Sequence, residues 1–297
     1  MKNIRIGTRS SQLALKQTQM VIDSIKATGN YIFEIVPITT TGDKIQNKPL
    51  YDIGGKALFL KEIEEALLTD KIDIAVHSMK DVPATLPDGL IITAVLERED
   101  PRDVLISRKA NSISTLPRGA TIGTSSVRRR AQILHIRPDI EIHSIRGNVP
   151  TRLDKWRDMS LDGIVLAAAG IKRLGLHDFA YCHILSEEEM LPAVCQGIIA
   201  VEVRDNDQEM KTICASINHK ETWQLMRAER GFLEYINGDC RTPLGALARF
   251  ETGKIHASYM LAGENLEYYK TYQSFSEIAD GYEMGVSIAK KMVHSKN

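Results

Sequence analysis

Residues Ile72 to Pro83 read IDIAVHSMKDVP, and this segment guides the interpretation of the first half of the chain. Its apolar start has the length and composition of a buried strand, and its polar end closes on a proline. In an open α/β sheet, ligands bind outside the carboxyl ends of the strands, so His77 to Asp81 lie where chemistry is usually done. The alternative is that Asp81 only caps a turn or a helix start, because aspartate often does so through local hydrogen bonds.

A second strand, turn and helix start are predicted in residues 121–130, which read TIGTSSVRRR. The Gly-Thr-Ser turn presents backbone N–H groups and hydroxyls to an anion. Three arginines in the first turn of a helix oppose its macrodipole, so we expect an anion between them and the helix N-terminus. A merely solvated basic face is the alternative interpretation.

The same order of elements is predicted near the amino terminus, where residues 4–11 (IRIGTRSS) lead into a helical pattern. Ile6-Gly7-Thr8 resembles Ile122-Gly123-Thr124, and the apolar runs at 73–76 and 162–166 also resemble each other. These similarities predict two α/β lobes built on one plan. Chance similarity between strand-turn-helix units is the competing explanation.

The remaining patterns predict the division of the 297 residues into domains. Residues 41–55 form a long loop, which is typical of a lid or a disordered segment. We predict an α/β protein of three domains: a first lobe at 1–97 with 196–216, a second lobe at 98–195, and a small C-terminal α+β domain at 217–297. The patterns behind this division are a returning strand at 198–203, a helix at 222–235, strands at 244–250, 255–261 and 267–274, and a final helix ending near His294.

Composition argues against several classes of function. Lys plus Arg and Asp plus Glu both number 38, so no bulk field would recruit nucleic acid or an anionic membrane. We see no secretory or membrane-spanning segment and expect a cytoplasmic protein. The four cysteines and eight histidines show no zinc-site spacing, so we expect neither a metal site nor a disulfide framework. Gly54-Gly55-Lys56 is not a Walker motif, because Leu50 and Ala57 occupy positions that require Gly and Ser/Thr.

Cys240 lies in an unusual context for a free cysteine. Cysteines are usually small buried hydrophobes, and this interpretation suits Cys182 and Cys214. Cys240 instead lies in the loop from Asn237 to Pro243, with polar neighbours and Arg241 beside it. Such a setting exposes a thiol and favours the thiolate.

An ordered set of short motifs runs along the chain. The motifs are TRSS (8–11), GD (42–43), GGK with LF (54–56, 58–59), HSMKDVP (77–83), EREDPRD (97–103), GTSSVRR (123–129), SIRGN (144–148), TRL (151–153), KRLGL (172–176) and the Cys240 loop. In this order they closely resemble the hydroxymethylbilane synthase family, also called porphobilinogen deaminases. The resemblance covers nearly the whole chain, and the ordered set is specific although each motif alone is weak.

The resemblance implies an enzyme that condenses four porphobilinogen molecules head to tail, releases four ammonia molecules and frees hydroxymethylbilane by hydrolysis. It also implies two lobes like those of periplasmic binding proteins and a third domain whose loop cysteine holds a dipyrromethane cofactor by a thioether. By motif, Cys240 is the attachment site and Asp81 the catalytic carboxylate. The further residues implied are Lys80, Arg128, Arg129, Arg173, Ser78, Thr124 and Ser126 for the cofactor, Arg9, Ser11, Arg146 and Arg152 for the substrate and growing chain, and Lys56 and Phe59 for the lid.

The chain departs from the family pattern at four positions. Asp239 and Arg241 replace the usual glycine and glutamine beside the cofactor cysteine, which puts the reach and charge of that loop in doubt. Cys195 stands where glycine is usual, near the inferred hinge. Asp52 stands where lysine is frequent, so a cationic role for that lid position is in doubt.

We expect a monomer whose partner is the small molecule porphobilinogen, with no nucleic-acid or membrane partner. The rival hypothesis is a non-catalytic two-lobed protein that binds an anion or senses an effector, since this architecture is widely used for binding alone. That hypothesis accounts for Thr8, Arg9 and residues 124–129. It does not account for the Cys240 loop or for Asp81, whose charge would repel a carboxylate ligand.

Overall fold

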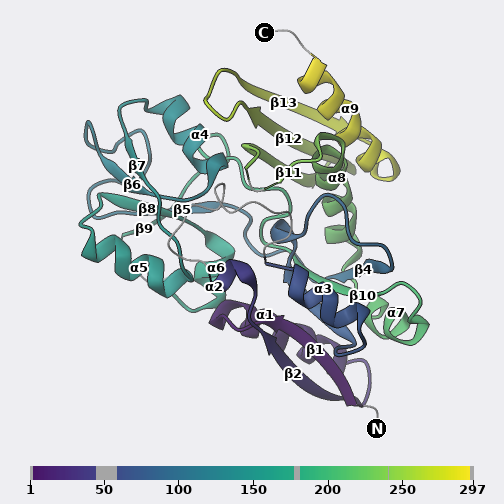
Figure 1. The fold of residues 1–297 in the computed structure, drawn as a ribbon. Helices are drawn as coiled ribbons and strands as arrows, with labels where there is room; N and C mark the ends of the chain where they lie inside the picture. Colours follow the sequence, from purple (N-terminus) through teal and green to yellow (C-terminus); the bar gives the residue numbers. More distant parts are fainter. Residues whose placement is uncertain (1–2, 45–58, 177–180, 240, 295–297) are drawn as a thin grey trace. The chain divides into compact units, whose positions relative to one another are not determined.

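The computed structural model describes residues 3–44, 59–176, 181–239 and 241–294 (Figure 1). These residues form two compact units, with residues 3–44, 59–99 and 198–223 in unit 1 and the rest in unit 2. Within the described residues, the chain therefore passes between the units after residues 99, 197 and 223. The finer division into three domains stays a prediction.

Unit 1 contains a five-stranded sheet in the order β2-β1-β3-β10-β4. β1 is parallel to β2 and β3, whereas β10 runs antiparallel between β3 and β4. The expectation that a strand near residues 198–203 rejoins the first sheet is confirmed. The strands are β1 (Asn3–Arg9), β2 (Ile32–Ile38), β3 (Ile74–Ser78), β4 (Leu90–Val95) and β10 (Ile199–Arg204).

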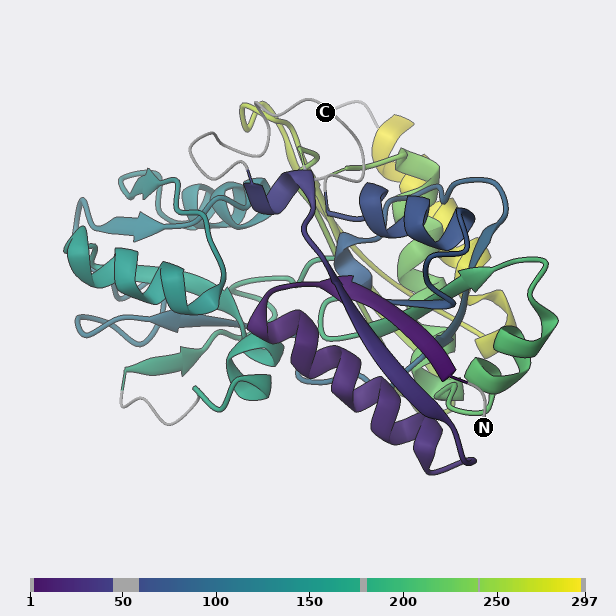
Figure 2. The same cartoon turned by 60° about the horizontal axis from the view of Figure 1, so that its bottom comes forward.

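Helices pack on both faces of this sheet, and the alternation of strand side chains assigns residues to each face. Val76 and Val201 share one core with apolar residues of α1 and α7, and Ala75 shares the other core with α3. Figure 2 shows α1 alongside β1 and β2. The start of the predicted 41–55 loop is helical, and its remainder lies outside the described residues. The helices are α1 (Gln12–Lys26), α2 (Thr41–Lys44), α3 (Lys61–Leu68), the 3₁₀ helix η2 (Met79–Asp81) and α7 (Gln208–Ala215).

Unit 2 contains a second five-stranded sheet in the order β7-β6-β8-β5-β9. Its first three strands are parallel, and β5 runs antiparallel between β8 and β9. This matches the order and directions of the first sheet, so the expectation of two lobes on one plan is confirmed. The elements are β5 (Asp103–Ile106), β6 (Thr121–Gly123), α4 (Val127–Ile136), β7 (Glu141–His143), α5 (Val149–Asp158), β8 (Gly163–Ala167), α6 (Ala168–Arg173) and β9 (Cys182–Ile184).

The C-terminal part is a three-stranded antiparallel sheet with helices, as the sequence predicted. Its helices α8 and α9 approach closely because glycines line the contact: a Cβ at Gly285 would lie 2.3 Å from the carbonyl oxygen of Ala228. None of the described helices is long and apolar enough to cross a bilayer. The elements are α8 (Lys220–Ile236), β11 (Leu244–Glu251), β12 (Lys254–Ala262), β13 (Tyr269–Ser276), the 3₁₀ helix η3 (Ile278–Asp280) and α9 (Gly281–His294).

A buried carboxylate on α8 joins two other parts of unit 2. Glu229 is fully buried and accepts hydrogen bonds from the backbone N–H groups of Cys195 (2.6 Å) and Ala248 (2.8 Å). The three-stranded sheet β11-β12-β13 packs apolar residues, among them Leu247 and Met260, against Ala131 of α4. α4 is therefore held directly by the C-terminal part of the chain.

Replacing Glu229 with alanine should destabilise the protein, because two buried N–H groups lose their acceptor. We expect a loss of about 3 kcal/mol in the free energy of unfolding, since each orphaned buried group costs roughly 1–3 kcal/mol. Urea unfolding followed by circular dichroism measures the change. Glu221→Ala, an exposed position in the first turn of the same helix, is the matched control. Equal midpoints for the two variants would contradict this role of Glu229.

Candidate functional site

The predicted catalytic carboxylate lies in a short turn at the carboxyl end of β3, in unit 1. Ser78 ends the strand and the 3₁₀ helix Met79–Asp81 follows, anchored by the buried Met79, whose N–H donates to the carbonyl of Ile198 at 2.9 Å. Lys80 is exposed and Asp81 is half-buried. No ion-pair or hydrogen-bond partner of the Asp81 carboxylate is found in the described part of the chain. The Asp81 carboxylate is therefore available to a ligand, and it caps no described helix.

The end of β3 is held from both faces of the sheet, because adjacent residues of a strand point to opposite sides. His77 Nε2 lies 2.9 Å from an oxygen of Glu202 on β10. Ser78 Oγ lies 2.9 Å from Nε2 of Gln17 on α1 and accepts its hydrogen bond. Sequence reasoning missed Gln17; the signal was an amide side chain on the buried face of α1, beside Ala14, Thr18 and Val21.

Arg9 lies at the end of β1 and already has a carboxylate partner. Its guanidinium forms an ion pair with Asp43 and lies 4.3 Å from the ring centre of Phe59. Burial alone would raise the pKa of Asp43, but the bond to Arg9 holds it below its ordinary value. Ser11 caps α1 by accepting a hydrogen bond from the N–H of Ala14 at 3.3 Å. Arg9 and Phe59 are thus brought together, whereas Lys56 lies outside the described residues.

In unit 2, the anion expected beside the arginines of α4 is supplied by the protein itself. Asp103, at the start of β5, accepts hydrogen bonds from Nη2 of Arg128 and Nη2 of Arg129, both at 2.8 Å. Burial would raise the pKa of Asp103, but the two guanidinium groups hold it well below its ordinary value. Ser126 caps α4 through its contact with the N–H of Arg129, and Thr124 accepts the N–H of Ser126. The sequence had no signal for this pairing, since Asp103 lies 25 and 26 residues from its partners.

The Asp103 cluster still lacks negative charge and hydrogen-bond acceptors. Two guanidinium groups face one carboxylate, and both arginines are about 95% buried, with 4% and 5% of their surface exposed. The Nε–H groups of Arg128 and Arg129 have no acceptor in the described part of unit 2. A buried, incompletely compensated cation is costly, so this cluster suits the carboxylate of an acidic ligand. The acetate and propionate groups of a dipyrromethane fit it.

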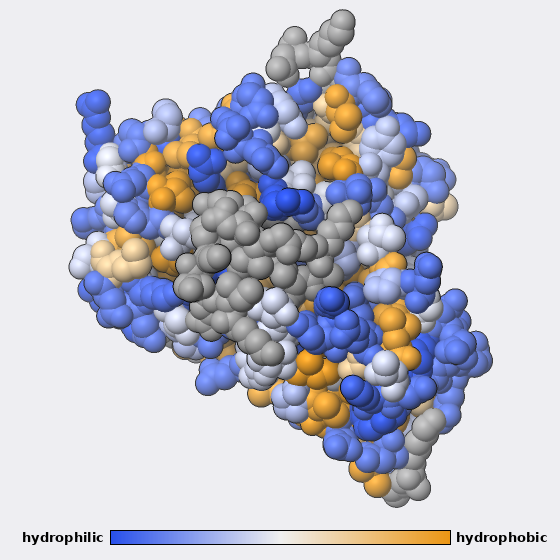
Figure 3. Space-filling view, viewed as in Figure 1, coloured by the Kyte–Doolittle hydropathy of each residue, from blue (hydrophilic) through white to orange (hydrophobic). Residues whose placement is uncertain are grey.

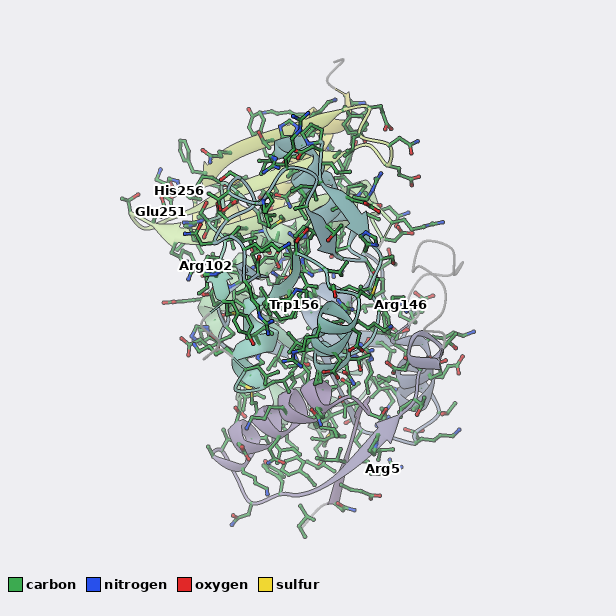
Figure 4. All side chains as sticks on the ribbon, turned by 90° about the vertical axis from the view of Figure 1, so that its left-hand side faces the viewer. Arg5, Arg102, Arg146, Trp156, Glu251 and His256 are labelled. Atoms are coloured by element: carbon green, nitrogen blue, oxygen red, sulfur yellow. The ribbon has the colours of Figure 1, made fainter. Side chains whose placement is uncertain are left out.

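Arg146 and Arg152 lie on one loop and the helix that follows it. Arg152 Nε donates to the carbonyl of Gly147 at 2.8 Å, and Asn148 caps α5. Gly147 has a φ of 123°, and a Cβ there would lie 2.6 Å from Thr151, so the turn requires glycine. Arg146, labelled in Figure 4, is buried just before α5. Arg173, at the end of α6, donates to the carbonyl of Gly197 at 2.7 Å.

Cys240 lies outside the described residues, but its neighbours explain one departure from the family pattern. Arg241 Nη2 pairs with Asp239 at 2.8 Å, and the N–H of Arg241 also donates to that carboxylate. The two unusual charges therefore offset each other. β11 begins at Leu244, and a Cβ at Gly245 would lie only 3.4 Å from Cδ of Arg128. The strand that follows the Cys240 loop thus packs directly against the arginine cluster.

The described cysteines are poor nucleophiles. Burial raises the pKa of Cys182, and it raises the pKa of Cys214 to about 12. Cys195 is buried and has a φ of 59°, a left-handed conformation that explains why glycine suits this position. Among residues outside the gaps, no group of histidine, cysteine and carboxylate side chains could hold a metal ion.

Comparison with known proteins gives a family for the whole chain. A family model described as porphobilinogen deaminase, dipyromethane cofactor binding domain, matches residues 4–212, and the porphobilinogen deaminase C-terminal domain matches residues 223–294. One similar solved structure is that of the probable amino-acid ABC transporter extracellular-binding protein of Bacillus subtilis. Its TM-score is 0.46 at 10% sequence identity, and the match covers 75% of this chain and 91% of that one. This similarity is too distant to assign a function.

Curated relatives are much closer. The porphobilinogen deaminase of Orientia tsutsugamushi (strain Boryong) is 51% identical over 288 residues, covering 97% of each chain. That of Rickettsia prowazekii (strain Madrid E) is 50% identical over 293 residues, covering 98% of each chain. Because the matches to models and relatives span nearly every residue, the chain belongs to the porphobilinogen deaminase family.

Proposed function

We propose that Asp81 and Cys240 are the residues with which this enzyme condenses four porphobilinogen molecules into hydroxymethylbilane, releasing four ammonia molecules. Its family makes the protein a hydroxymethylbilane synthase of tetrapyrrole biosynthesis that uses a dipyrromethane cofactor. The observation that carries the proposal is the buried Arg128–Asp103–Arg129 cluster, which is short of one negative charge. This family assignment sets aside the rival of a protein that only binds an anion.

Asp81 performs electrostatic and proton-transfer work in this proposal. Loss of ammonia from the aminomethyl group leaves a cation on the substrate, and a fixed carboxylate stabilises it. The turn at the end of β3 holds Asp81 in place without occupying its carboxylate, as this work requires. The same carboxylate relays a proton to the leaving amine and accepts one from the new ring junction.

The cationic residues bind the carboxylates of the pyrrole rings. When bound, dipyrromethane supplies the free α-carbon of its terminal pyrrole as the nucleophile. Arg128, Arg129, Arg173 and Lys80 hold its acetate and propionate groups, because planar guanidinium forks match carboxylates. Ser78 supplies a hydroxyl at the end of β3, and Thr124 and Ser126 supply hydroxyls between β6 and α4.

A second set of residues receives the incoming ring. Arg9 and Ser11 follow β1, and Arg146 and Arg152 flank the start of α5. Several arginines are needed because each added ring brings two more carboxylates. Phe59, against which Arg9 packs, and Lys56 belong to a lid over the substrate.

We further propose a cytoplasmic monomer without a nucleic-acid or membrane partner. The balanced charges, 38 of each sign, support this. On the face drawn in Figure 3, hydrophobic residues lie in separate groups among hydrophilic ones. Size-exclusion chromatography with light scattering tests the monomer.

Asp81→Asn should fold and keep its cofactor but lose most turnover, because the amide is isosteric and uncharged. Removing a preorganised charge-stabilising group typically lowers the rate by about 10²–10³. The measurement is hydroxymethylbilane formation, detected as uroporphyrin, together with ammonia release. Steady-state activity within about twofold of wild type would rule out Asp81 as the catalytic carboxylate.

Arg129→Leu and Arg152→Leu should fail in different ways if one arginine holds the cofactor and the other the incoming ring. Intact mass should show that Arg129→Leu is poor in cofactor, whereas Arg152→Leu carries cofactor and stalls with a partial chain. Arg130→Leu, an exposed neighbour on the same helix, is the control and should match wild type. Identical mass distributions for the first two variants would refute this division of roles.

The covalent anchor gives a direct test of Cys240. A thioether makes each addition intramolecular at the anchored end, which favours reaction through proximity. Purified active protein should exceed its sequence mass by one dipyrromethane, and brief exposure to porphobilinogen should add a ladder of pyrrole units. Cys240→Ser should lose both features. Cys195→Gly should keep both, since glycine tolerates the left-handed backbone there. An adduct mapped to any cysteine other than Cys240 would overturn the assignment.

A further inference from the structure

Three titratable side chains are buried in unit 1 on elements that contact one another, one of which is the strand that leads into the Asp81 turn. They are Glu64 on α3, His77 on β3 and Glu202 on β10, with 4%, 5% and 0% of their surface exposed. His77 Nε2 lies 2.9 Å from one oxygen of Glu202. One oxygen each of Glu64 and Glu202 is buried without a partner in the described residues. We call these residues the Glu64 cluster.

The two strands that this cluster links are also the two that hold the catalytic turn. The backbone of His77 pairs with Ala200, and the N–H of Met79 donates to Ile198. Asp81 follows two residues later. β10 also changes register against β4 between Val201 and Glu202, an irregularity of the kind that redirects a side chain. A shift of the His77–Glu202 contact would therefore move the base of the Asp81 turn.

A second negative charge in this cluster is energetically unfavourable. Glu202 pairs with the imidazole of His77, whereas one oxygen of the buried Glu64 has no partner among the described residues, and an unpaired charge removed from water is costly. Burial, together with the nearby Glu202, raises the pKa of Glu64 to about 7. Glu64 is thus the group that holds a proton near neutrality.

The other charged groups on this side of the sheet are engaged elsewhere. Arg5 pairs with Asp73, Arg9 with Asp43 and Arg204 with Asp207. On α3 itself, Glu62 accepts hydrogen bonds from Thr41, and Lys61 pairs with Glu65. Glu34 of β2 contacts Asn3. The nearby groups that act on Glu64 are Glu202 and His77.

We propose that the Glu64 cluster positions the Asp81 turn, and that it does so only while the Glu64 carboxyl is protonated. The proposal rests on the proposed role of Asp81. None of the three residues contacts the reacting atoms in this proposal; they act through the end of β3.

The sign of the pH dependence follows from Glu64. Its carboxyl keeps a proton in the folded protein to about pH 7, whereas the unfolded chain releases it near 4.5. The folded state therefore binds more protons in this interval, so the free energy of unfolding falls as pH rises from about 4.5 through about 7. Above that range a second buried negative charge weakens the cluster.

The test compares kcat and KM for porphobilinogen across pH 6–9, per mole of protein that intact mass shows to carry cofactor. Wild-type kcat should decline as pH rises through about 7, and Glu64→Gln should remove most of that decline. Glu65→Gln, an exposed neighbour on α3, is the control and should keep the wild-type profile. His77→Gln should lower kcat about tenfold or more with KM within about twofold, since small misplacements of a catalytic group are costly.

Superimposable pH profiles for wild type and Glu64→Gln would overturn the proposal, even if the thermal midpoints differ, because a purely structural role changes only stability. Wild-type kcat in loaded His77→Gln would overturn it as well. If His77→Gln does not fold, the Glu64→Gln profile decides alone. Asp81→Asn, assayed alongside, distinguishes the proposed role of Asp81 from the positioning role of the Glu64 cluster. Full activity in that variant would refute the role of Asp81 itself. Loss of activity there, with unchanged profiles in the cluster variants, would refute only the positioning role.

Discussion

The buried contact of Asp103 with Arg128 and Arg129 is the interaction on which unit 2 depends. Two guanidinium groups on consecutive residues would repel each other away from water, and desolvating each costs several kcal/mol. A single carboxylate at the start of β5 bridges them and also accepts a hydrogen bond from Gln196 at 2.9 Å. The arginines are therefore fixed before any ligand arrives. A site fixed in advance loses little conformational freedom on binding, which is how preorganisation raises affinity.

Gln196 extends this constraint to two of the places where the chain enters or leaves unit 2. Its side chain donates to the carbonyl of Pro101 at 2.7 Å as well as to Asp103. Residues 101 and 196 lie next to two of the places where the chain passes between the units, after residues 99 and 197. One amide thus ties both places to the carboxylate that holds the arginines.

Much of the fold could be predicted from the sequence because its signals are local. The strand and turn at 121–126 and the return of 198–203 to the first sheet follow from short apolar runs and punctuating residues. Partnerships across the fold could not be predicted in the same way. Asp103 lies in a recognisable motif, yet nothing in the spacing indicates that it neutralises Arg128. Gln17 stands out as an amide on the buried face of α1, but nothing in the sequence indicates that its partner is Ser78, 61 residues away. Ser11 and Ser126 illustrate a different difficulty, because a hydroxyl before a helix serves equally well as a cap or as a ligand donor.

The position of β10 has a consequence for how the protein is made. β10 lies inside the first sheet, between β3 and β4, but it is encoded after every strand of the second sheet. During synthesis, β4 has no partner strand until residues 199–204 have left the ribosome. The second sheet, whose strands all lie between residues 103 and 184, has its complete set earlier. Domains usually fold in the order in which they are translated. In this chain the sheet that is begun first is completed after the second sheet, and its open edge must stay out of contact with other nascent chains in the meantime.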